Sequence, residues 1–430
     1  MRYILIIFNK ILYRTVKFDT KDILMKTALF EEPNDILTGV AYKNIHIRKT
    51  IVSYFADAGN ATIADLCKET NLSVPKVTAL ITELIADGLV KDFGKVGSTG
   101  GRRPNIYGLV PDSGFFLGVD VKHNHLNIGL IDLQKKPIKI SRNVPYTLNN
   151  TAESLASLCE LIRNFIREAN TSTGKILGLG LNLSGRINYA TGYSYSFFHF
   201  NEDPLSQVLE RELNIKTYLE NDSRAMAYGE FNCGVVKEEK NVLFLNLDYG
   251  LGMGVMINNE LYYGKSGFAG ELGHIPLFNN EIICQCGKKG CLETEASGRA
   301  LISMFKEKLL AGSSTVLNKK ATDDIQMQDI INAANNDDVL SIELLAKIGE
   351  KLGRGIALLI NIFNPELVII GGALAATGEH LHLPIKSAVN KFSLSLVNTD
   401  TQLKTSKLGE DAGVMGACLL VRKRLLEYPL

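Results

Sequence analysis

The sequence predicts an α/β protein in two parts, a small helical module with a hairpin followed by a larger, two-lobed domain. Three short helical patterns separated by turn residues precede residue 110, and two strand–turn–strand patterns recur in the remainder with helices between them. The chain has 430 residues, of which 46% are hydrophobic and 22% charged, which suffices for two or three domains with sizeable cores. Apolar runs stop short of the ~20 residues that a membrane-spanning helix needs, so we expect none.

Residues 1–40 are expected to form an N-terminal extension. Its start, Met1 to Phe8, is apolar, but basic residues interrupt it and no small-residue cleavage site follows, which argues against a signal peptide. We interpret Met1–Leu24 as the product of an upstream start codon, with Met25 as the native start.

Residues 41–110 are predicted to form a winged helix-turn-helix, a DNA-binding motif. Apolar residues at helical spacing predict a first helix over Ile47–Ala58, a second over Ile63–Glu69, and a third that Ser73 caps and that ends at Ala86. In this layout the third helix enters the major groove by its N-terminal residues. The residues on or beside its open face, which we expect to contact DNA, are Ser73, Pro75, Lys76, Thr78, Ala79 and Thr82.

A hairpin follows, and its tip carries adjacent arginines, Arg102 and Arg103, within the glycine-rich stretch Gly97–Pro104. Such a tip suits a wing laid on phosphates or inserted into a narrow A·T-rich minor groove. Residues 43–110 hold nine Lys and Arg against six Asp and Glu, a net charge of +3, whereas residues 111–430 hold 32 against 35, a net charge of −3. The local basic excess favours a DNA partner over the alternative, a small winged helix that docks on another protein.

Residues 111–430 are predicted to form the two-lobed α/β domain. Strands that alternate with helices, and two hairpins that carry glycine, suggest a doubled fold with a cleft between the lobes. The main patterns, in chain order, are Phe115–Leu133 (two strands), Thr151–Ala169 (helix), Ile176–Leu183 (strand), Val242–Ile257 (two strands), Ser341–Ile362 (helix) and Leu367–Ile370 (strand).

Three cysteines and a histidine near the middle of the chain predict a metal site. Cys284, Cys286 and Cys291 form a C-x-C-x₄-C knuckle that follows His274 after a gap of nine residues. Thiolates and a neutral imidazole at this spacing can surround Zn²⁺ tetrahedrally, and four protein ligands leave no open position, so the zinc would be structural. The alternative is three unrelated core cysteines. The other four cysteines lie in apolar stretches, which fits a reducing cytoplasm rather than a disulfide framework.

The segment Gly267–His274, the knuckle that continues to Glu293, and Glu220–Asp222 resemble the signature of the ROK family, which comprises repressors, open reading frames and sugar kinases. The resemblance covers residues 43–430. It implies an actin-like, ribonuclease H-like fold of two lobes with a sugar in the cleft. The kinases of the family lack a DNA-binding module, whereas its repressors have one.

The resemblance also indicates that the nucleotide site of the kinases is dismantled here. Asp120–His125 stands where the kinases cradle ATP phosphates with an Asp-x-Gly-Gly-Thr turn, and it keeps the aspartate but neither glycine nor the threonine. In the second phosphate turn, Asp248 and Tyr249 precede Gly250 and add a charge and a bulky ring. We therefore expect poor binding of ATP and no enzymatic activity.

The sugar site is retained by the same resemblance. Its residues are Asn221, Asp222, Glu271, His274 and Glu293. His274 would serve both zinc and sugar, and Asp222 would be the catalytic base if the protein were a kinase. The alternative is that these are surface or helix-capping polar residues. The segment Phe197–Asn201 departs from the Asn-containing loop of the family, which points to a different preferred sugar.

These patterns together predict a cytoplasmic, sugar-responsive repressor of carbohydrate metabolism genes. Its expected partners are a double-stranded DNA operator, a sugar or sugar phosphate as effector, structural Zn²⁺, and further copies of itself in a homodimer or higher homo-oligomer. Two alternatives stay open: an active ATP-dependent sugar kinase with a fused regulatory module, and an interaction protein whose winged helix docks on another protein.

Overall fold

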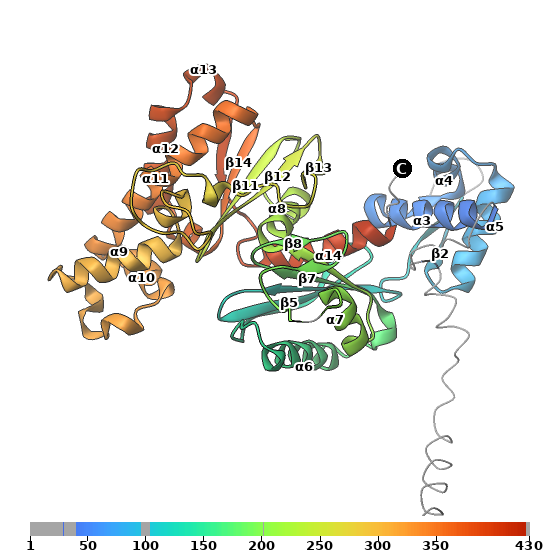
Figure 1. The fold of residues 1–430 in the computed structure, drawn as a ribbon. Coiled ribbons are helices and arrows are strands. Elements are labelled where there is room, and N and C mark those ends of the chain that lie inside the picture. The colour runs from blue at the N-terminus through green and yellow to red at the C-terminus, as the bar shows by residue number, and fades with distance from the viewer. Residues whose placement is uncertain (1–28, 30–39, 96–103, 201, 427–430) are drawn as a thin grey trace, which may run out of the picture.

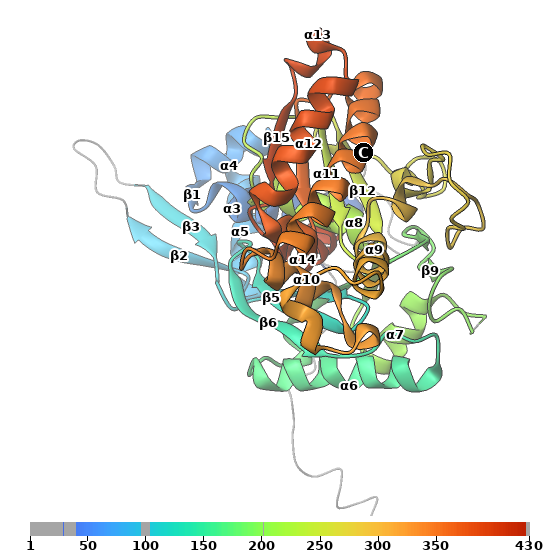
Figure 2. The same ribbon diagram turned by 90° about the vertical axis from the view of Figure 1, so that its left-hand side faces the viewer.

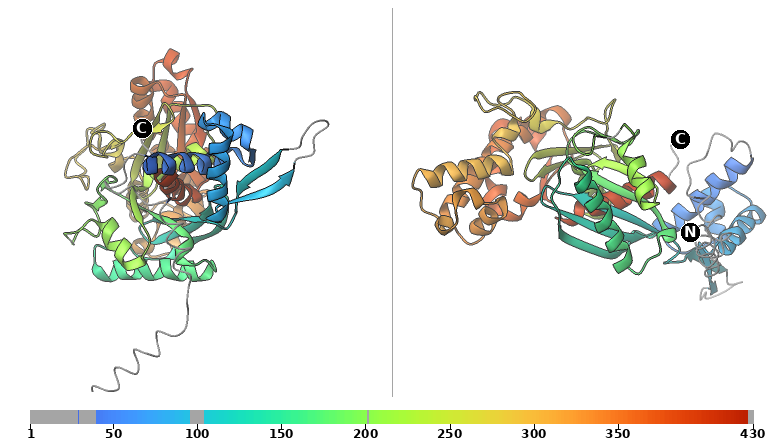
Figure 3. Two further views of the ribbon diagram at one scale, coloured as in Figure 1. Left: turned by 90° about the vertical axis from the view of Figure 1, so that its right-hand side faces the viewer. Right: turned by 60° about the horizontal axis from the view of Figure 1, so that its bottom comes forward.

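The computed structural model describes residue 29 and residues 40–95, 104–200 and 202–426. Three parts follow one another along the molecule: the winged-helix module, a first lobe in the middle and a second lobe at the far end (Figures 1 and 3). Arg102, Arg103, Asn201 and most of the N-terminal extension lie outside the described residues. None of the helices within the described ranges combines the length and apolar composition that crossing a membrane requires.

The N-terminal module has the three helices and the hairpin that the sequence predicts. Its elements are α3 (Val40–Ala58), β1 (Ala61–Thr62), α4 (Ile63–Thr70), α5 (Val74–Ala86), β2 (Val90–Lys95) and β3 (Asn105–Leu109). Thr62 and Asp65 cap α4 reciprocally, because the Thr62 N–H donates to the Asp65 carboxylate and the Asp65 N–H donates to Thr62 Oγ1. Ser73 occupies the N-cap position of α5, but its side chain makes no capping hydrogen bond, contrary to our prediction. Strands β2 and β3 project away from the two lobes (Figure 2).

The first lobe is a five-stranded sheet in the order β10-β7-β4-β5-β6. Its elements are β4 (Phe115–Val121), β5 (His125–Asp132), β6 (Pro137–Pro145), α6 (Ala152–Glu168), β7 (Ile176–Leu183), β8 (Ile187–Asn188), β9 (Tyr193–Ser194), α7 (Leu205–Leu213) and β10 (Thr217–Asn221). Helices α6 and α7 cover one face, where they bury Leu117 and Val119 of β4 in an apolar core. The antiparallel pair and the buried strand at Ile176–Leu183 confirm the predicted patterns.

The second lobe repeats this arrangement in a sheet ordered β13-β12-β11-β14-β15. In both lobes the first strand is central, pairs antiparallel with the next strand, and pairs parallel with a later one. The elements are β11 (Val242–Leu247), β12 (Leu251–Ile257), β13 (Glu260–Leu261), α9 (Gly298–Leu310), α10 (Met327–Ala334), α11 (Val339–Phe363), β14 (Leu367–Gly371), α12 (Glu379–Phe392), α13 (Ser395–Asn398) and β15 (Gln402–Thr405). The doubled α/β fold is thus confirmed.

Two helices pack against each other between the lobes, α8 (Asp222–Cys233) and α14 (Asp411–Leu426). α8 lies on β11 and β12 of the second lobe, and α14 lies on β4 and β7 of the first. Their backbones approach so closely that a Cβ on Gly416 would lie 1.8 Å from the carbonyl oxygen of Ala225. One cluster of buried apolar residues continues from the winged-helix core through α14 to α8.

This close approach predicts that Gly416→Ala destabilises the fold. The added methyl group has to push α14 away from the backbone of α8, and such overpacking typically costs about 1–3 kcal/mol. The free energy of unfolding in urea measures the effect. Gly174→Ala is the matched control, because a Cβ at Gly174 would meet nothing within 4 Å. Equal stability of the two variants would contradict the close helix contact.

Candidate functional site

The four predicted metal ligands converge in the second lobe. One ligand atom from each of His274, Cys284, Cys286 and Cys291 lies within 4.8 Å of all the others. His274 Nδ1 is 3.4 Å from Cys284 Sγ, and the Sγ atoms of Cys286 and Cys291 are 3.6 Å apart. A tetrahedral Zn²⁺ with Zn–S bonds of about 2.3 Å holds its sulfur ligands about 3.8 Å apart, so this donor set and its spacing fit zinc.

The cysteine loop takes its shape from two glycines with positive φ. Gly287 has φ +84° and Gly290 has φ +75°, values that other residues adopt only with strain. The Cys284 N–H donates to the Lys288 carbonyl oxygen at 2.8 Å, which closes the turn between the first two cysteines and the third. At Gly290 a Cβ would lie 2.1 Å from the Phe278 carbonyl oxygen, so only glycine fits.

Glu271 and Glu293 lie beside this cluster, of which His274 is a member. His274 Nε2 lies 3.7 Å from a Glu271 carboxylate oxygen, while its Nδ1 faces Cys284. Glu293 accepts a hydrogen bond from the Leu251 N–H at 3.1 Å and has its other oxygen 3.9 Å from Cys284 Sγ. The Glu271 side chain is 49% exposed, which leaves it open to a ligand.

Asn221 and Asp222 lie where β10 ends and α8 begins. Asn221 caps the helix, because its Oδ1 accepts hydrogen bonds from the N–H groups of Ser223 and Arg224. The capping alternative considered from the sequence is therefore real for the Asn221 oxygen. Asp222 accepts from the Ser223 N–H at 2.7 Å and approaches Asn246 Nδ2 at 3.4 Å.

The start of β12 joins these two groups of residues. Its first residue, Leu251, carries the N–H that Glu293 accepts. Its second, Gly252, packs so tightly on α8 that a Cβ would lie 2.0 Å from Ser223 Oγ. The residues predicted to bind sugar thus flank one strand end from two sides, α8 and the metal loop.

The two turns that correspond to the phosphate turns of the kinases contact each other directly. Lys122 Nζ lies 3.2 Å from an Asp120 carboxylate oxygen and 3.9 Å from one of Asp248 in the other lobe. The His123 and Tyr249 rings stack with centroids 5.2 Å apart and planes 9° from parallel. The loss of glycine in these turns is visible in the sequence, whereas the contact of Lys122 with both lobes is not.

Asp222 has an unusual titration behaviour in this setting. Burial raises the pKa of its carboxyl to about 6; the Lys122 ammonium opposes the rise, and the charges of Asp120 and Asp248 add to it. Burial also disfavours the charged form of Lys122, yet Asp120, Asp248 and Asp222 outweigh this effect and raise the Lys122 pKa. Lys122 is therefore a firmly protonated cation among carboxylates.

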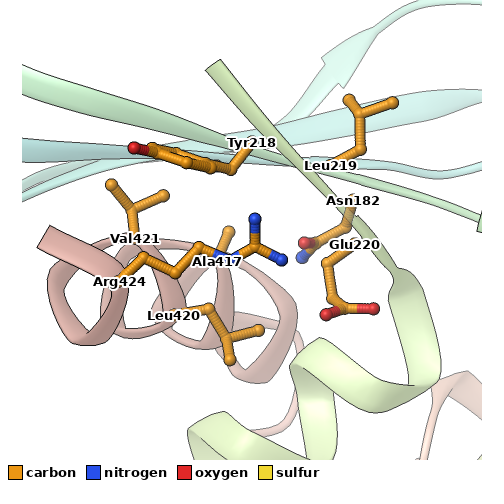
Figure 4. A pocket seen from close by; sticks show the side chains of 9 residues that line it. Asn182, Tyr218, Leu219, Glu220, Ala417, Leu420, Val421 and Arg424 are labelled. Atoms are coloured by element: carbon orange, nitrogen blue, oxygen red, sulfur yellow. The ribbon is translucent and has the colours of Figure 1, made fainter. Parts of the chain in front are cut away.

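A small pocket lies behind this region, between α14 and the strands β7 and β10 (Figure 4). The Arg424 side chain extends from α14 toward Asn182 and Glu220 there, and its guanidinium lies 5.1 Å from the Tyr218 ring centroid. The buried Oδ1 of Asn182 has no hydrogen-bond partner, whereas its Nδ2 donates to the Gly413 carbonyl oxygen at 2.8 Å. The pocket contains none of the predicted sugar residues.

The predicted DNA face of α5 is largely open to solvent. Ser73, Pro75, Thr78, Ala79 and Thr82 are exposed. The Thr78 and Thr82 hydroxyls donate to carbonyl oxygens one turn earlier in the helix. The sixth residue of the face, Lys76, is half-buried, and its Nζ donates to Asn44 Oδ1 of α3 at 2.8 Å, a contact that the sequence pattern did not reveal.

The Asp222 pKa predicts a pH-dependent effect of Asp222→Asn on stability. The pKa of about 6 exceeds the ordinary value of 3.8, so the folded protein holds the proton more tightly than the unfolded chain. Stability that protonated Asp222 contributes is present at low pH and is lost as pH rises toward and through 6. In urea unfolding, the free energy of unfolding of the variant should therefore rise relative to that of the parent between pH 4.5 and 7.5, by on the order of 1–3 kcal/mol.

The control for this experiment is Asp323→Asn, which removes a carboxylate from an exposed residue of the second lobe. Its stability difference from the parent should stay constant over the same pH range. A constant difference for Asp222→Asn as well would show that the Asp222 pKa is not raised.

Comparison with known proteins agrees with this architecture. Residues 116–424 match the model of the ROK family, and residues 46–91 match that of a winged helix-turn-helix DNA-binding domain. The xylose repressor of Caldicellulosiruptor bescii is 30% identical over 368 residues, which cover 85% of this chain and 92% of that protein. The DNA-binding transcriptional dual regulator NagC of Escherichia coli is 27% identical over 366 residues, covering 84% and 88%.

Solved structures extend the similarity to the whole fold. A ROK family transcriptional regulator described as a homologue of the E. coli MLC protein has a TM-score of 0.73 and 25% identity, and covers 89% of this chain and 97% of its own. A ROK family glucokinase from Streptomyces griseus, in complex with glucose and AMPPNP, has a TM-score of 0.64 and 26% identity, and covers 72% and 100%. The chain belongs to the ROK family, with a winged helix-turn-helix added before the two-lobed domain.

Proposed function

We propose that this protein is a sugar-responsive DNA-binding repressor whose kinase-like domain senses the sugar and does not phosphorylate it. One observation carries the proposal: the two turns that would cradle ATP phosphates contact each other through Lys122, Asp248, His123 and Tyr249. A nucleotide needs free backbone N–H groups and space at both turns. The winged helix, and relatives named as repressors, support the same assignment.

One observation favours a second candidate, an ATP-dependent sugar kinase. Asp222 stands at the position of the catalytic base, and its pKa of about 6 lies close to the working pH that suits a general base. The glucokinase similarity points the same way. The blocked phosphate turns weigh more, because a base without a phosphoryl donor transfers nothing.

We assign the sugar to Asn221, Asp222, Glu271, His274 and Glu293. Their carboxylate, amide and imidazole groups can share hydrogen bonds with neighbouring hydroxyls of a sugar. Asn221 would contribute through the second N–H of its amide, since its oxygen already caps α8 and one N–H donates to the Gly185 carbonyl oxygen. We assign structural Zn²⁺ to His274 and the three knuckle cysteines, where it would fix the loop that holds Glu271 and Glu293. His274 would orient toward the sugar by its Nε2.

We assign residues 1–40 to an extension, 41–110 to DNA binding and 111–430 to sugar sensing. The open face of α5 would enter the major groove, and Arg102 and Arg103 would lie on the backbone or in the minor groove. Lys76 would have to exchange its bond with Asn44 for a contact with DNA. A homodimer or higher homo-oligomer would present two such modules to two half-sites.

Sugar binding has a direct physical route to the DNA-binding module. Asn221 and Asp222 start α8, α8 packs on α14, and Arg422 of α14 donates to the Asp57 carboxylate at the end of α3 at 2.9 Å. Lys135 of the first lobe pairs with the same Asp57 oxygen at 2.8 Å. A sugar that shifts α8 would therefore shift the support of α3.

The proposal is tested with a DNA duplex that the full-length protein selects from a random library. Fluorescence anisotropy with D-xylose, D-glucose and N-acetyl-D-glucosamine should show that one sugar changes the affinity for DNA by about 5–150-fold, the range of typical coupling. Glu271→Gln should bind the duplex but lose the response, because it removes a charged acceptor from the sugar site. Glu307→Gln, on the exposed side of α9, is the control and should respond like the parent.

The same preparations decide against the kinase. Phosphorylation of the three sugars with ATP should stay at background. Robust ATP-dependent phosphorylation that disappears in Asp222→Asn would contradict the proposed repressor and show that the protein is a sugar kinase.

Zinc is tested by elemental analysis. About one Zn²⁺ per chain should copurify, and a chelator should lower the melting temperature, because metal binding contributes folding free energy. Cys286→Ser should lose the metal, whereas Cys67→Ser, in the winged-helix module, should keep it. A folded, sugar-binding protein without metal would refute the zinc assignment.

A further inference from the structure

The part of the site next to Asp222 has an unbalanced charge. Asp120 from the first lobe, Asp222 at the start of α8, and Asp248 from the second lobe gather around one ammonium group, Lys122. Asp120 is fully buried, and its carboxylate oxygens have no hydrogen-bond partner other than the Lys122 ammonium 3.2 Å away. Three carboxylates against one cation leave an excess of negative charge. We call these four residues the Lys122 cluster.

Lys122 has no capacity left for an anionic ligand. Its side chain is only 12% exposed, its Nζ is shared between carboxylates of both lobes, and Met226 Sδ of α8 lies 3.6 Å away. A tethered ammonium here supplies positive charge without a nucleotide or a bound cation. A phosphate brought to it would have to displace the carboxylates that hold it.

Of the two arginines nearby, Arg224 is held by hydrogen bonds within the protein, and Arg299 is stacked on an aromatic ring. Arg224 of α8 donates to Glu220 and to the carbonyl oxygens of Gly267 and Ile187. Arg299 of α9 stacks on Tyr249 with its guanidinium carbon 5.0 Å from the ring centroid, and its buried Nε has no hydrogen-bond partner. An incoming dianion would thus meet carboxylates first, and like charges in a poorly hydrated site repel strongly.

We propose that the effector of this protein is an uncharged sugar, and that the Lys122 cluster excludes phosphorylated sugars from the site. The inference rests on the proposed function and narrows the effector class, which the sequence left open between a sugar and a sugar phosphate. Hydroxyl groups suit the cluster, because each can donate to Asp222 while a phosphate oxygen can only accept.

Titration calorimetry of the full-length protein tests the proposal with matched pairs. D-Glucose is compared with D-glucose 6-phosphate, and N-acetyl-D-glucosamine with its 6-phosphate; D-xylose and inorganic phosphate are measured alone. For the sugar that binds, the phosphate ester should bind at least about 100-fold more weakly, as repulsion by the excess carboxylates requires. The ratio of the dissociation constant of the phosphate ester to that of the sugar should be smaller at high salt, because ionic strength screens charge repulsion.

Two variants identify the cause of the discrimination. Asp248→Asn removes one carboxylate beside Lys122. The ratio of the dissociation constant of the phosphate ester to that of the sugar should therefore fall about tenfold. Lys122→Met deepens the negative charge and should not weaken any residual binding of the ester. Asp323→Asn removes the same charge from an exposed residue outside the Lys122 cluster and should leave the ratio of the two dissociation constants unchanged.

The outcomes separate this inference from the function on which it rests. Tighter binding of a phosphate ester, lost in Lys122→Met or Arg299→Gln, overturns the exclusion and leaves a sugar-phosphate-responsive repressor. Binding of neither member of any pair, nor of D-xylose, overturns the inference together with the sugar half of the proposed function. A ratio that Asp248→Asn does not change removes the Lys122 cluster as the cause.

Discussion

The contact between α8 and α14 is the constraint on which the rest of the structure depends. Gly416 lets the two backbones approach, and each helix packs on the sheet of one lobe. A movement of either lobe therefore has to displace the contact between the two helices. The same pair connects the ends of the molecule: α8 begins at Asp222, and α14 ends beside Asp57 of the DNA-binding module. Because packed helices have few alternative arrangements, a small shift of α8 at the start of the helix has to be accompanied by a shift of α14 near Asp57.

The turn at Lys122 is occupied by charged side chains that contact each other across the lobes. By the family resemblance, the kinases have glycines in this turn, whereas here a tight turn at Lys122–His125 joins β4 and β5, and the Lys122 ammonium lies beside Asp120 and Asp248. Burying the Asp120 carboxylate with a single ammonium as its partner is costly, and the ion pair with Lys122 offsets part of that cost. Lys122 and Asp248 form an ion pair across the lobes, and this pair favours the arrangement in which the lobes stay in contact.

Features that depend on local sequence could be predicted. The strand β7 coincides with its predicted range because an apolar run bounded by turns needs no distant information. The metal knuckle was equally accessible, since Gly287 and Gly290 and three nearby cysteines define a loop by themselves. For the residues that we propose to bind sugar, the resemblance to a family supplied the grouping, because Asn221 and Glu271 belong to different elements and no spacing relates them.

What could not be predicted is the pairing of residues far apart in the chain. Lys122 meets Asp248, Arg422 meets Asp57, and Lys76 turns back to Asn44, and in each case hydropathy shows only a polar residue at the surface of its own element. The two hairpins belong to different sheets, and it is the packing of the two lobes that brings their turns together. A missing glycine therefore indicates that the turn has changed, but the contacts of the residue that replaces it become visible only once the position of the opposite lobe is known.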